Sequence, residues 1–268
     1  ALTRGNPSLK SATINNYDVK VEWFPSAGEI ISISGFYKKM HNPIEYSRGN
    51  ADPTYFTTRI PVNSGDAIVQ GVEVEIRKKV DFIPFAPILN HVTVFGNGTL
   101  LKSHVVSKQI NDTYFNTLDA HQLTGQPNYI VNLGLSILAI KNTAELTVSY
   151  NRTGDYINEL GSSSSDRGLA NGTFVPRVPH FRVKARNLVD IVITQSLLKN
   201  KCKLKFNVSN LFNERYILYQ DLNNNGKFDS PVLINKNKPE ANYLSGADNT
   251  VSSIRPQRTY SLSVTYTF

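Results

Sequence analysis

Thr259-Tyr-Ser-Leu-Ser-Val-Thr-Tyr-Thr-Phe268 is the stretch of sequence that decides the fold. Aromatic and aliphatic side chains occupy its even-numbered positions, and serine or threonine occupies its odd-numbered ones. Because side chains alternate between the two faces of a β-strand, this stretch predicts a strand with one apolar and one polar face. Such a strand suits a bacterial outer-membrane barrel, with lipid outside and a wet lumen inside. It also suits the closing strand of a soluble β-sandwich, so other parts of the chain must separate the two.

Eight further stretches show the same alternation, and no segment has convincing helical periodicity. In one of them, Leu133, Leu135 and Ile137 alternate with polar or small residues. Another shifts phase along its length, which predicts a β-bulge near Asn187. The nine predicted strands are residues 13–24, 29–46, 67–80, 88–106, 127–139, 142–157, 179–198, 201–219 and 259–268.

The connections between these strands alternate between short and long. Short periplasmic turns and long extracellular loops are typical of outer-membrane barrels, whereas a sandwich has no reason to sort its loops in this way. The short connections are residues 25–28, 81–87, 140–142 and 199–200, and the long polar ones are residues 47–66, 107–126, 158–178 and 220–253. We therefore predict an all-β, antiparallel, up-and-down transmembrane β-barrel. Bacterial single-chain barrels have an even number of strands, so nine strands indicate either one strand that the pattern does not reveal or the C-terminal part of a larger barrel. The lack of a signal-peptide pattern favours the second interpretation.

The composition excludes several other classes of protein. No run approaches the eighteen or so apolar residues of a transmembrane helix, so a membrane role would have to come from strands. The single cysteine, Cys202, excludes an internal disulfide. The net charge of +8 is spread along the chain, which argues against nucleic-acid binding. The five histidines are scattered and lie in no catalytic motif, and the N-terminus has no signal-peptide pattern.

Several motifs together resemble the C-terminal barrel region of TonB-dependent receptors, the plugged transporters of the outer membrane. They occur in the order of that family and span nearly the whole chain, and Asn210-Leu-Phe-Asn213 is the most specific. The loop Asp221-Leu-Asn-Asn-Asn-Gly-Lys-Phe-Asp229 resembles receptors of Bacteroidetes-type bacteria. The other motifs are Gly5-Asn-Pro-Ser-Leu-Lys10, Phe36-Tyr-Lys-Lys-Met-His-Asn-Pro-Ile44, Gly71-Val-Glu-Val-Glu75 and the terminal strand.

The resemblance implies a 22-stranded barrel of the bacterial outer membrane, of which residues 1–268 would be the last nine strands, with the plug domain absent from this chain. It implies energy-coupled uptake of a scarce nutrient, which could be a siderophore, haem, a vitamin, a glycan or a peptide, and no enzyme activity. The implied partners are the TonB complex, through the absent N-terminal part, the barrel-assembly machinery, through the terminal strand, and a surface lipoprotein. Two alternatives stay open: a complete small outer-membrane barrel (a pore or adhesin) with a tenth strand within residues 230–250, and a soluble secreted β-sandwich that binds glycans.

Two groups of residues are candidate binding sites. Aromatic side chains in the long loops could stack on a ligand, and these are Tyr46, Tyr55, Phe56, Tyr114, Phe115 and Tyr243. The loop at residues 221–229 has the spacing of a calcium-binding loop, with oxygen ligands at its first, third, fifth, seventh (backbone) and ninth positions. Those residues are Asp221, Asn223, Asn225, Lys227 and Asp229. The usual glutamate at the twelfth position is replaced by Val232, so a polar loop in which these residues serve turn geometry is the alternative.

Overall fold

The computed structural model describes residues 2–49, 58–81, 87–106, 108–112, 115–118, 120–139, 143–161, 179–222, 226–229 and 248–268. Nearly all regular structure in these ranges is β-strand, together with one short 3₁₀-helix, η1 (Pro87–His91). No helix in the same ranges is long and apolar enough to cross a membrane.

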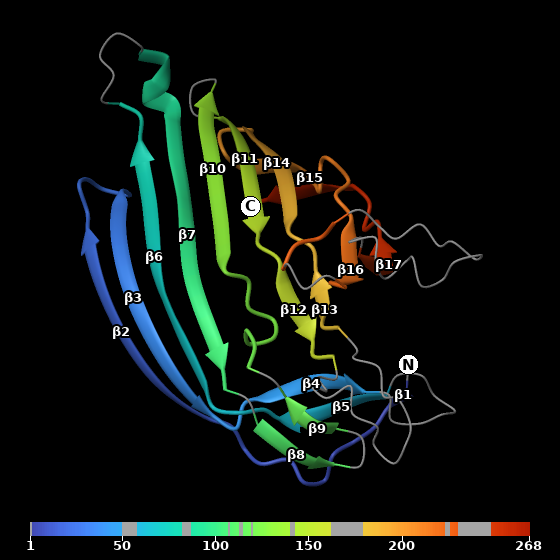
Figure 1. Cartoon of the computed structure of the whole chain (residues 1–268). Helices are drawn as coiled ribbons and strands as arrows, with labels where there is room; N and C mark the ends of the chain where they lie inside the picture. The colour runs from blue at the N-terminus through green and yellow to red at the C-terminus, as the bar shows by residue number, and fades with distance from the viewer. Residues whose placement is uncertain are drawn as a thin grey trace.

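Nine antiparallel strands form one curved sheet, in which strands that follow one another in the meander are hydrogen-bonded neighbours (Figure 1). This sheet confirms the predicted all-β, up-and-down architecture and its nine strands. Below, the end of the sheet where β2 leads into β3 is called the turn end, and the opposite end is called the loop end. In chain order the strands are β2 (Thr13–Trp23), β3 (Ile30–His41), β6 (Ala67–Lys79), β7 (Val92–Val105), β10 (Tyr129–Ala139), β11 (Ala144–Thr153), β14 (Arg186–Leu197), β15 (Cys202–Ser209) and β18 (Thr259–Tyr266).

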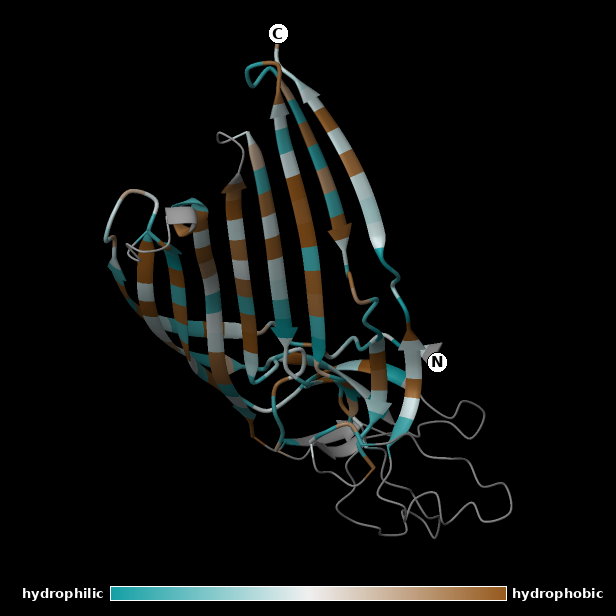
Figure 2. Ribbon diagram, turned by 90° about the horizontal axis from the view of Figure 1, so that it is seen from above, coloured by the Kyte–Doolittle hydropathy of each residue, from teal (hydrophilic) through white to brown (hydrophobic). Residues whose placement is uncertain are grey.

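The outer, convex face of the sheet is apolar and exposed. Val21 pairs with Ile33, which in turn pairs with Val74, so apolar side chains form continuous rows across the strands. Figure 2 shows the resulting alternation of hydrophobic and hydrophilic residues along each strand. In the ranges that the structure describes, no second sheet packs on this face, and side chains such as Leu133 and Leu262 stay 53% and 69% exposed. The β-sandwich alternative is therefore wrong.

The inner, concave face is largely polar. Asn132 donates a hydrogen bond to Asn97 Oδ1 at 2.7 Å, and Asn151 donates one to Asn132 Oδ1 at 2.6 Å, so an asparagine ladder crosses three strands. The alternation places Glu73, Glu75, Arg77, Lys203 and Lys205 on the same face. A wet inner wall and an apolar outer wall are the arrangement of a membrane barrel.

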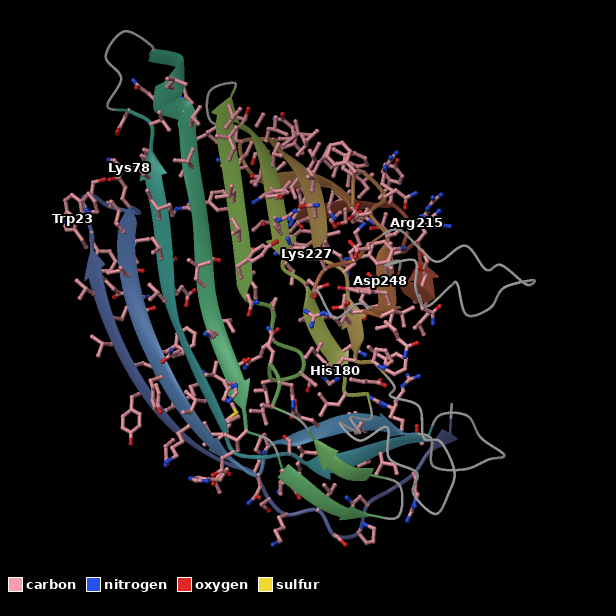
Figure 3. All side chains as sticks on the ribbon, in the orientation of Figure 1. Trp23, Lys78, His180, Arg215, Lys227 and Asp248 are labelled. Carbon is pink, nitrogen blue, oxygen red and sulfur yellow. The ribbon has the colours of Figure 1, made fainter. Side chains whose placement is uncertain are left out.

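Aromatic side chains mark both boundaries of the apolar face. Trp23, Phe24 and Tyr266 are exposed at the turn end, where Figure 3 labels Trp23 beside the end of β2. Tyr17, Tyr37 and Tyr260 are exposed near the loop end of their strands. Two such girdles enclose the lipid-facing band of outer-membrane barrels.

The loop end contains more β-structure than the sequence predicted. Parts of the predicted loops 47–66, 107–126 and 220–253 are strands, and four predicted barrel strands are each divided into a barrel strand and a strand beyond it. The additional strands form a sheet of β1 (Leu2–Thr3), β5 (Thr58–Asn63) and β4 (Ile44–Gly49), a sheet of β12 (Tyr156–Glu159), β13 (Phe181–Val183), β16 (Tyr216–Gln220) and β17 (Asn249–Ile254), and the pair β8 (Lys108–Asp112) and β9 (Phe115–Leu118).

Residues with positive φ lie where strands leave the main sheet. Asn42 (φ 50°) separates β3 from β4, Asn210 (φ 53°) lies between β15 and β16, and Gln257 (φ 67°) lies between β17 and β18. A residue in the left-handed backbone conformation cannot continue a regular strand, and asparagine tolerates this conformation better than most residues do. The bulge predicted near Asn187 is wrong, because Asn187 pairs regularly with Arg152 and the interruption falls at Lys184 and Ala185. The predicted strand 88–106 also begins later, at Val92, because η1 occupies its first residues.

Replacing Asn210 with alanine should destabilise the fold by about 2–3 kcal/mol. Its side chain accepts a hydrogen bond from Glu214 N at 2.8 Å and donates one to Gln257 O at 3.2 Å, so it connects both sides of the break. Reversible urea unfolding of the protein in lipid vesicles measures the loss. Asn210→Gly should lose less stability than Asn210→Ala, because glycine adopts the positive φ without strain although it loses the same hydrogen bonds. Equal losses in the two variants would contradict this account.

Candidate functional site

Two of the additional sheets at the loop end, β1-β5-β4 and β12-β13-β16-β17, are bonded to each other. Arg48 N donates to Leu160 O at 2.7 Å, and Leu160 N donates to Tyr46 O at 2.8 Å, so β4 is bonded to the residue that follows β12. In the main sheet three strands separate β3 from β11, yet their continuations meet here. Figure 1 shows β4 and β5 extending from the ends of β3 and β6 across the concave side towards β12 and β13. We call the sheets β1-β5-β4 and β12-β13-β16-β17 the loop-end platform.

Two arginines of the platform stack on aromatic rings and share one carboxylate. The Arg59 guanidinium lies 3.5 Å from the centre of the Tyr46 ring, and that of Arg48 lies 4.4 Å from the centre of the Phe181 ring. Glu159 forms an ion pair with both arginines, at 3.0 Å to Arg59 Nε. The cluster therefore carries an excess of one positive charge, and the Arg59 side chain is one-third exposed. Stacked guanidinium groups suit planar or anionic ligands.

A buried ion pair lies under the platform. His121 Nε2 lies 2.9 Å from Glu45 Oε2, and both side chains are almost completely buried. Thr124 N donates to the other carboxylate oxygen at 2.8 Å. Burial disfavours the ionised carboxylate, but the hydrogen bonds from His121, Ser64 and Thr124 outweigh it and hold the pKa of Glu45 below its ordinary value. The pair fixes β4 to the segment that precedes β10.

A second polar cluster joins the residues that follow β11 to β13 and β16 of the platform. Arg182 Nε donates to Asp155 Oδ1 at 2.7 Å, and the Tyr219 hydroxyl donates to Asp155 Oδ2 at 2.5 Å. Tyr219 is fully buried, and Phe228 packs edge-on against its ring at 5.0 Å. Burial and the bond to Asp155 raise the pKa of Tyr219 well above its ordinary value, so the hydroxyl stays a donor. This cluster holds the loop at residues 226–229 against β16.

Backbone N–H groups of the predicted calcium loop donate to one carboxylate of the loop, that of Asp221, and to one from outside it, that of Asp248. Asp221 Oδ2 accepts from Gly226 N at 2.7 Å, and Gly226 has a φ of 75°. The fully buried Asp248 accepts from Leu222 N at 3.1 Å and from Asp229 N at 2.7 Å. Among the described residues, no group of three or more histidine, cysteine, aspartate or glutamate side chains could hold a metal ion. Asn223 and Asn225 lie outside the described residues, so calcium binding stays a prediction.

Of the candidate ligand-stacking aromatics, Tyr46 belongs to the platform, where it is partly exposed beside Arg59. Phe115 begins β9, although only its backbone is described. Tyr55, Phe56, Tyr114 and Tyr243 lie outside the described residues. Sequence reasoning missed Arg48 and Arg59 because it placed both in a loop. The alternation of Ile60 and Val62 with Arg59 and Pro61 was the available signal for β5.

Comparison with known proteins identifies the family. Residues 1–211 match the family described as TonB-dependent receptor-like, β-barrel. The chain belongs to this family. It matches no curated protein in sequence. The barrel places the apolar outer face in the lipid of the bacterial outer membrane, with the turn end periplasmic and the loop end extracellular.

Solved structures of such receptors have the same fold. The ferric enterobactin receptor of Pseudomonas aeruginosa, in complex with enterobactin, is 17% identical, with a TM-score of 0.54 over 99% of this chain and 33% of that one. The ferric-catecholate import receptor Fiu of E. coli is 13% identical, with a TM-score of 0.53 over 100% of this chain and 30% of that one. The chain thus spans about a third of the length of these receptors.

Proposed function

We propose that this chain forms part of the wall and the ligand platform of an outer-membrane receptor for energy-coupled uptake of a scarce nutrient. The observation that carries the proposal is the family match over residues 1–211. In the proposed mechanism the extracellular platform captures the nutrient, and the nutrient then passes through the polar lumen without chemical change. The TonB complex would supply the energy. The barrel-assembly machinery, acting on the terminal strand, and a surface lipoprotein are further proposed partners.

An anionic nutrient fits the platform better than a neutral glycan or a cationic peptide does. Arg48 and Arg59 face a single carboxylate, that of Glu159, and both guanidinium groups stack on aromatic rings. Such groups bind carboxylate and catecholate oxygens while presenting a flat surface to an aromatic ligand. The proposed ligand class is therefore an anionic, partly aromatic chelate.

Uptake by bacteria with and without the receptor tests the function. The panel consists of radiolabelled ferric enterobactin, haem, cobalamin, an oligosaccharide and a peptide. We expect uptake of one anionic compound to require the receptor and to stop when a protonophore removes the proton gradient. If the receptor changes the uptake of none of them, the anionic-nutrient proposal fails. Uptake of the oligosaccharide alone would keep the transport proposal and overturn the ligand class.

Replacing Arg59 with glutamine should weaken binding of that compound at least about tenfold, because a hydrogen bond to a charged group is worth about 1.5–3 kcal/mol. Arg48 would remain to pair with Glu159, so the platform should stay folded. Equilibrium binding to the purified receptor measures the change. Arg215→Gln is the matched control, since Arg215 is exposed and, among the residues that the structure describes, its side chain bonds to Ser253 Oγ alone, at 3.3 Å. Equal losses in the two variants would exclude Arg59 from the binding site.

A further inference from the structure

Two positive charges face each other directly on the platform. Arg48 of β4 and Arg59 of β5 are partners in the register, so both project from the same face of the sheet. Like charges directly opposite each other destabilise a pair of strands. Stacking on Phe181 and Tyr46 fixes the position of each guanidinium group but does not neutralise it. The two arginines therefore need an anion, and the chain itself provides one.

Glu159, the last residue of β12, is this anion. The register between β12 and β13 shifts between Ile157 and Glu159, and such a shift re-aims the side chain that follows it. The carboxylate of Glu159 pairs with both arginines. Its side chain is only 7% exposed, whereas that of Arg59 is 33% exposed. Glu159 thus binds the arginines from the buried side, and the exposed side of Arg59 is left for a ligand.

The Glu159 carboxylate lowers the net positive charge of the cluster, which a bound anion would meet, from two to one. Two unopposed arginines would hold a multiply charged anion tightly, yet a receptor that transports its ligand must also release it. Differences in affinity between related complexes lie mostly in the dissociation rate. A carboxylate that weakens binding therefore shortens the time that the anion stays on the platform. This step rests on the proposed function, namely uptake of an anionic nutrient.

We propose that Glu159 determines the specificity of the platform by competing with the nutrient for Arg48 and Arg59. Its carboxylate lowers the affinity for each ligand in proportion to the negative charge of that ligand, and it speeds release into the lumen. If Glu159 served only to hold the two arginines in place, removing its charge would disorder the cluster and weaken binding. Competition has the opposite sign, because removing the charge then strengthens binding.

Binding of iron(III) chelates of different charge to the purified, intact receptor tests the proposal. The probes are a tris-catecholate complex with three negative charges, a bis-catecholate hydroxamate complex with two, and a neutral tris-hydroxamate complex. Glu159→Gln should bind the tris-catecholate about tenfold more tightly, the effect of one unit charge close to a partly solvated site. The gain should be smaller for the doubly charged complex and absent for the neutral one. The dissociation rate should fall by about the same factor as the dissociation constant.

Uptake of the tris-catecholate by cells separates affinity from release. In Glu159→Gln, both the concentration that half-saturates uptake and the maximal rate should fall, because the ligand binds more tightly and leaves more slowly. Glu159→Asp keeps the negative charge and should bring both quantities back towards those of the unmodified receptor. The matched control is Glu214→Gln, which removes the same charge just before β16. In the described part of the chain the Glu214 side chain forms no ion pair, so this variant should bind as the unmodified receptor does.

The possible outcomes separate this inference from the proposed function. The inference alone is overturned if the receptor binds the charged chelates and Glu159→Gln binds them no more tightly. It is also overturned if the neutral chelate gains as much as the tris-catecholate, or if Glu214→Gln gains as much as Glu159→Gln. If neither the unmodified receptor nor Glu159→Gln binds a charged chelate, the inference and the anionic-nutrient proposal fail together.

Discussion

Replacing Glu45 with alanine should loosen the extracellular platform by about 3–5 kcal/mol, the usual cost of breaking a buried ion pair. The change leaves His121 buried without its partner and removes the acceptor of the Thr124 N–H group. Because the nine-stranded sheet does not depend on this pair, the loss should be local. Hydrogen exchange should show faster exchange at the Thr124 and Val105 amides, with the Val131 amide in β10 unchanged.

Glu45→Gln is the control for this prediction, because glutamine keeps the size of the side chain and an acceptor oxygen but removes the charge. In Glu45→Gln the Thr124 and Val105 amides should lose less protection against hydrogen exchange than they lose in the alanine variant. If the alanine variant exchanged at the rate of the unmodified protein, the Glu45–His121 pair would have no role in holding the platform.

The same pair predicts a dependence on pH. The pKa of Glu45 is lower in the folded protein than the ordinary value of about 4.3, so the carboxylate stabilises the fold above that value. This stabilisation is lost as the pH falls through the lowered pKa, since protonation then favours the open form. Protection of the Thr124 amide should therefore decrease below about pH 4, and it should decrease less in Glu45→Gln.

The sequence predicted the barrel wall well because a single physical rule controls it. Each strand of the wall has lipid on one face and water on the other, so alternation alone places Leu133 and Leu135 outward and Asn132 inward. The terminal strand, with Tyr260 to Tyr266 outward, follows the same rule. The alternation of short turns and long loops favours the barrel over the sandwich from the sequence alone.

The platform could not be predicted in this way because its contacts join distant parts of the chain. Glu45 and His121 are 76 residues apart, and Arg48 and Glu159 are 111 residues apart. β4 and β12 are short strands in an environment where neither face meets lipid. In β4 the polar Glu45 and Ser47 are the buried residues, whereas Ile44 and Tyr46 are exposed, so hydropathy does not show which face lies inside. Nothing in the sequence indicated that Asp248 is buried and hydrogen-bonded, because its two hydrogen-bond donors are 26 and 19 residues away in a polar loop.

Two of the motifs that resemble the family have a structural explanation. Asn42, in the segment Asn42-Pro-Ile44, and Asn210, in Asn210-Leu-Phe-Asn213, both have positive φ at positions where a strand leaves the barrel wall. These asparagines therefore define where the membrane-spanning part ends and the extracellular part begins. Asn210 also bonds to the neighbouring strand through Gln257, which keeps adjacent breaks at the same level.

Replacing Leu135 with arginine should destabilise the barrel by about 2–4 kcal/mol, the cost of a cation on the lipid face near the middle of the bilayer. Leu135 lies on the outer face between the two aromatic girdles, and its partners in the register are Val94 and Val148. No acceptor on these neighbours can satisfy a guanidinium group. Reversible unfolding from lipid vesicles measures the change in the free energy of unfolding. The amount of folded receptor in outer-membrane fractions measures assembly.

Ser136→Arg is the matched control, because it introduces the same side chain one residue away on the opposite face. Ser136 Oγ donates to Glu145 Oε1 at 2.6 Å, so an arginine there would lie beside a carboxylate in the wet lumen. Its effect should stay within about 1 kcal/mol, as for an exposed ion pair. Equal losses at the two positions would mean that lipid does not cover the outer face, whereas a large loss at Leu135 alone requires a bilayer on that side.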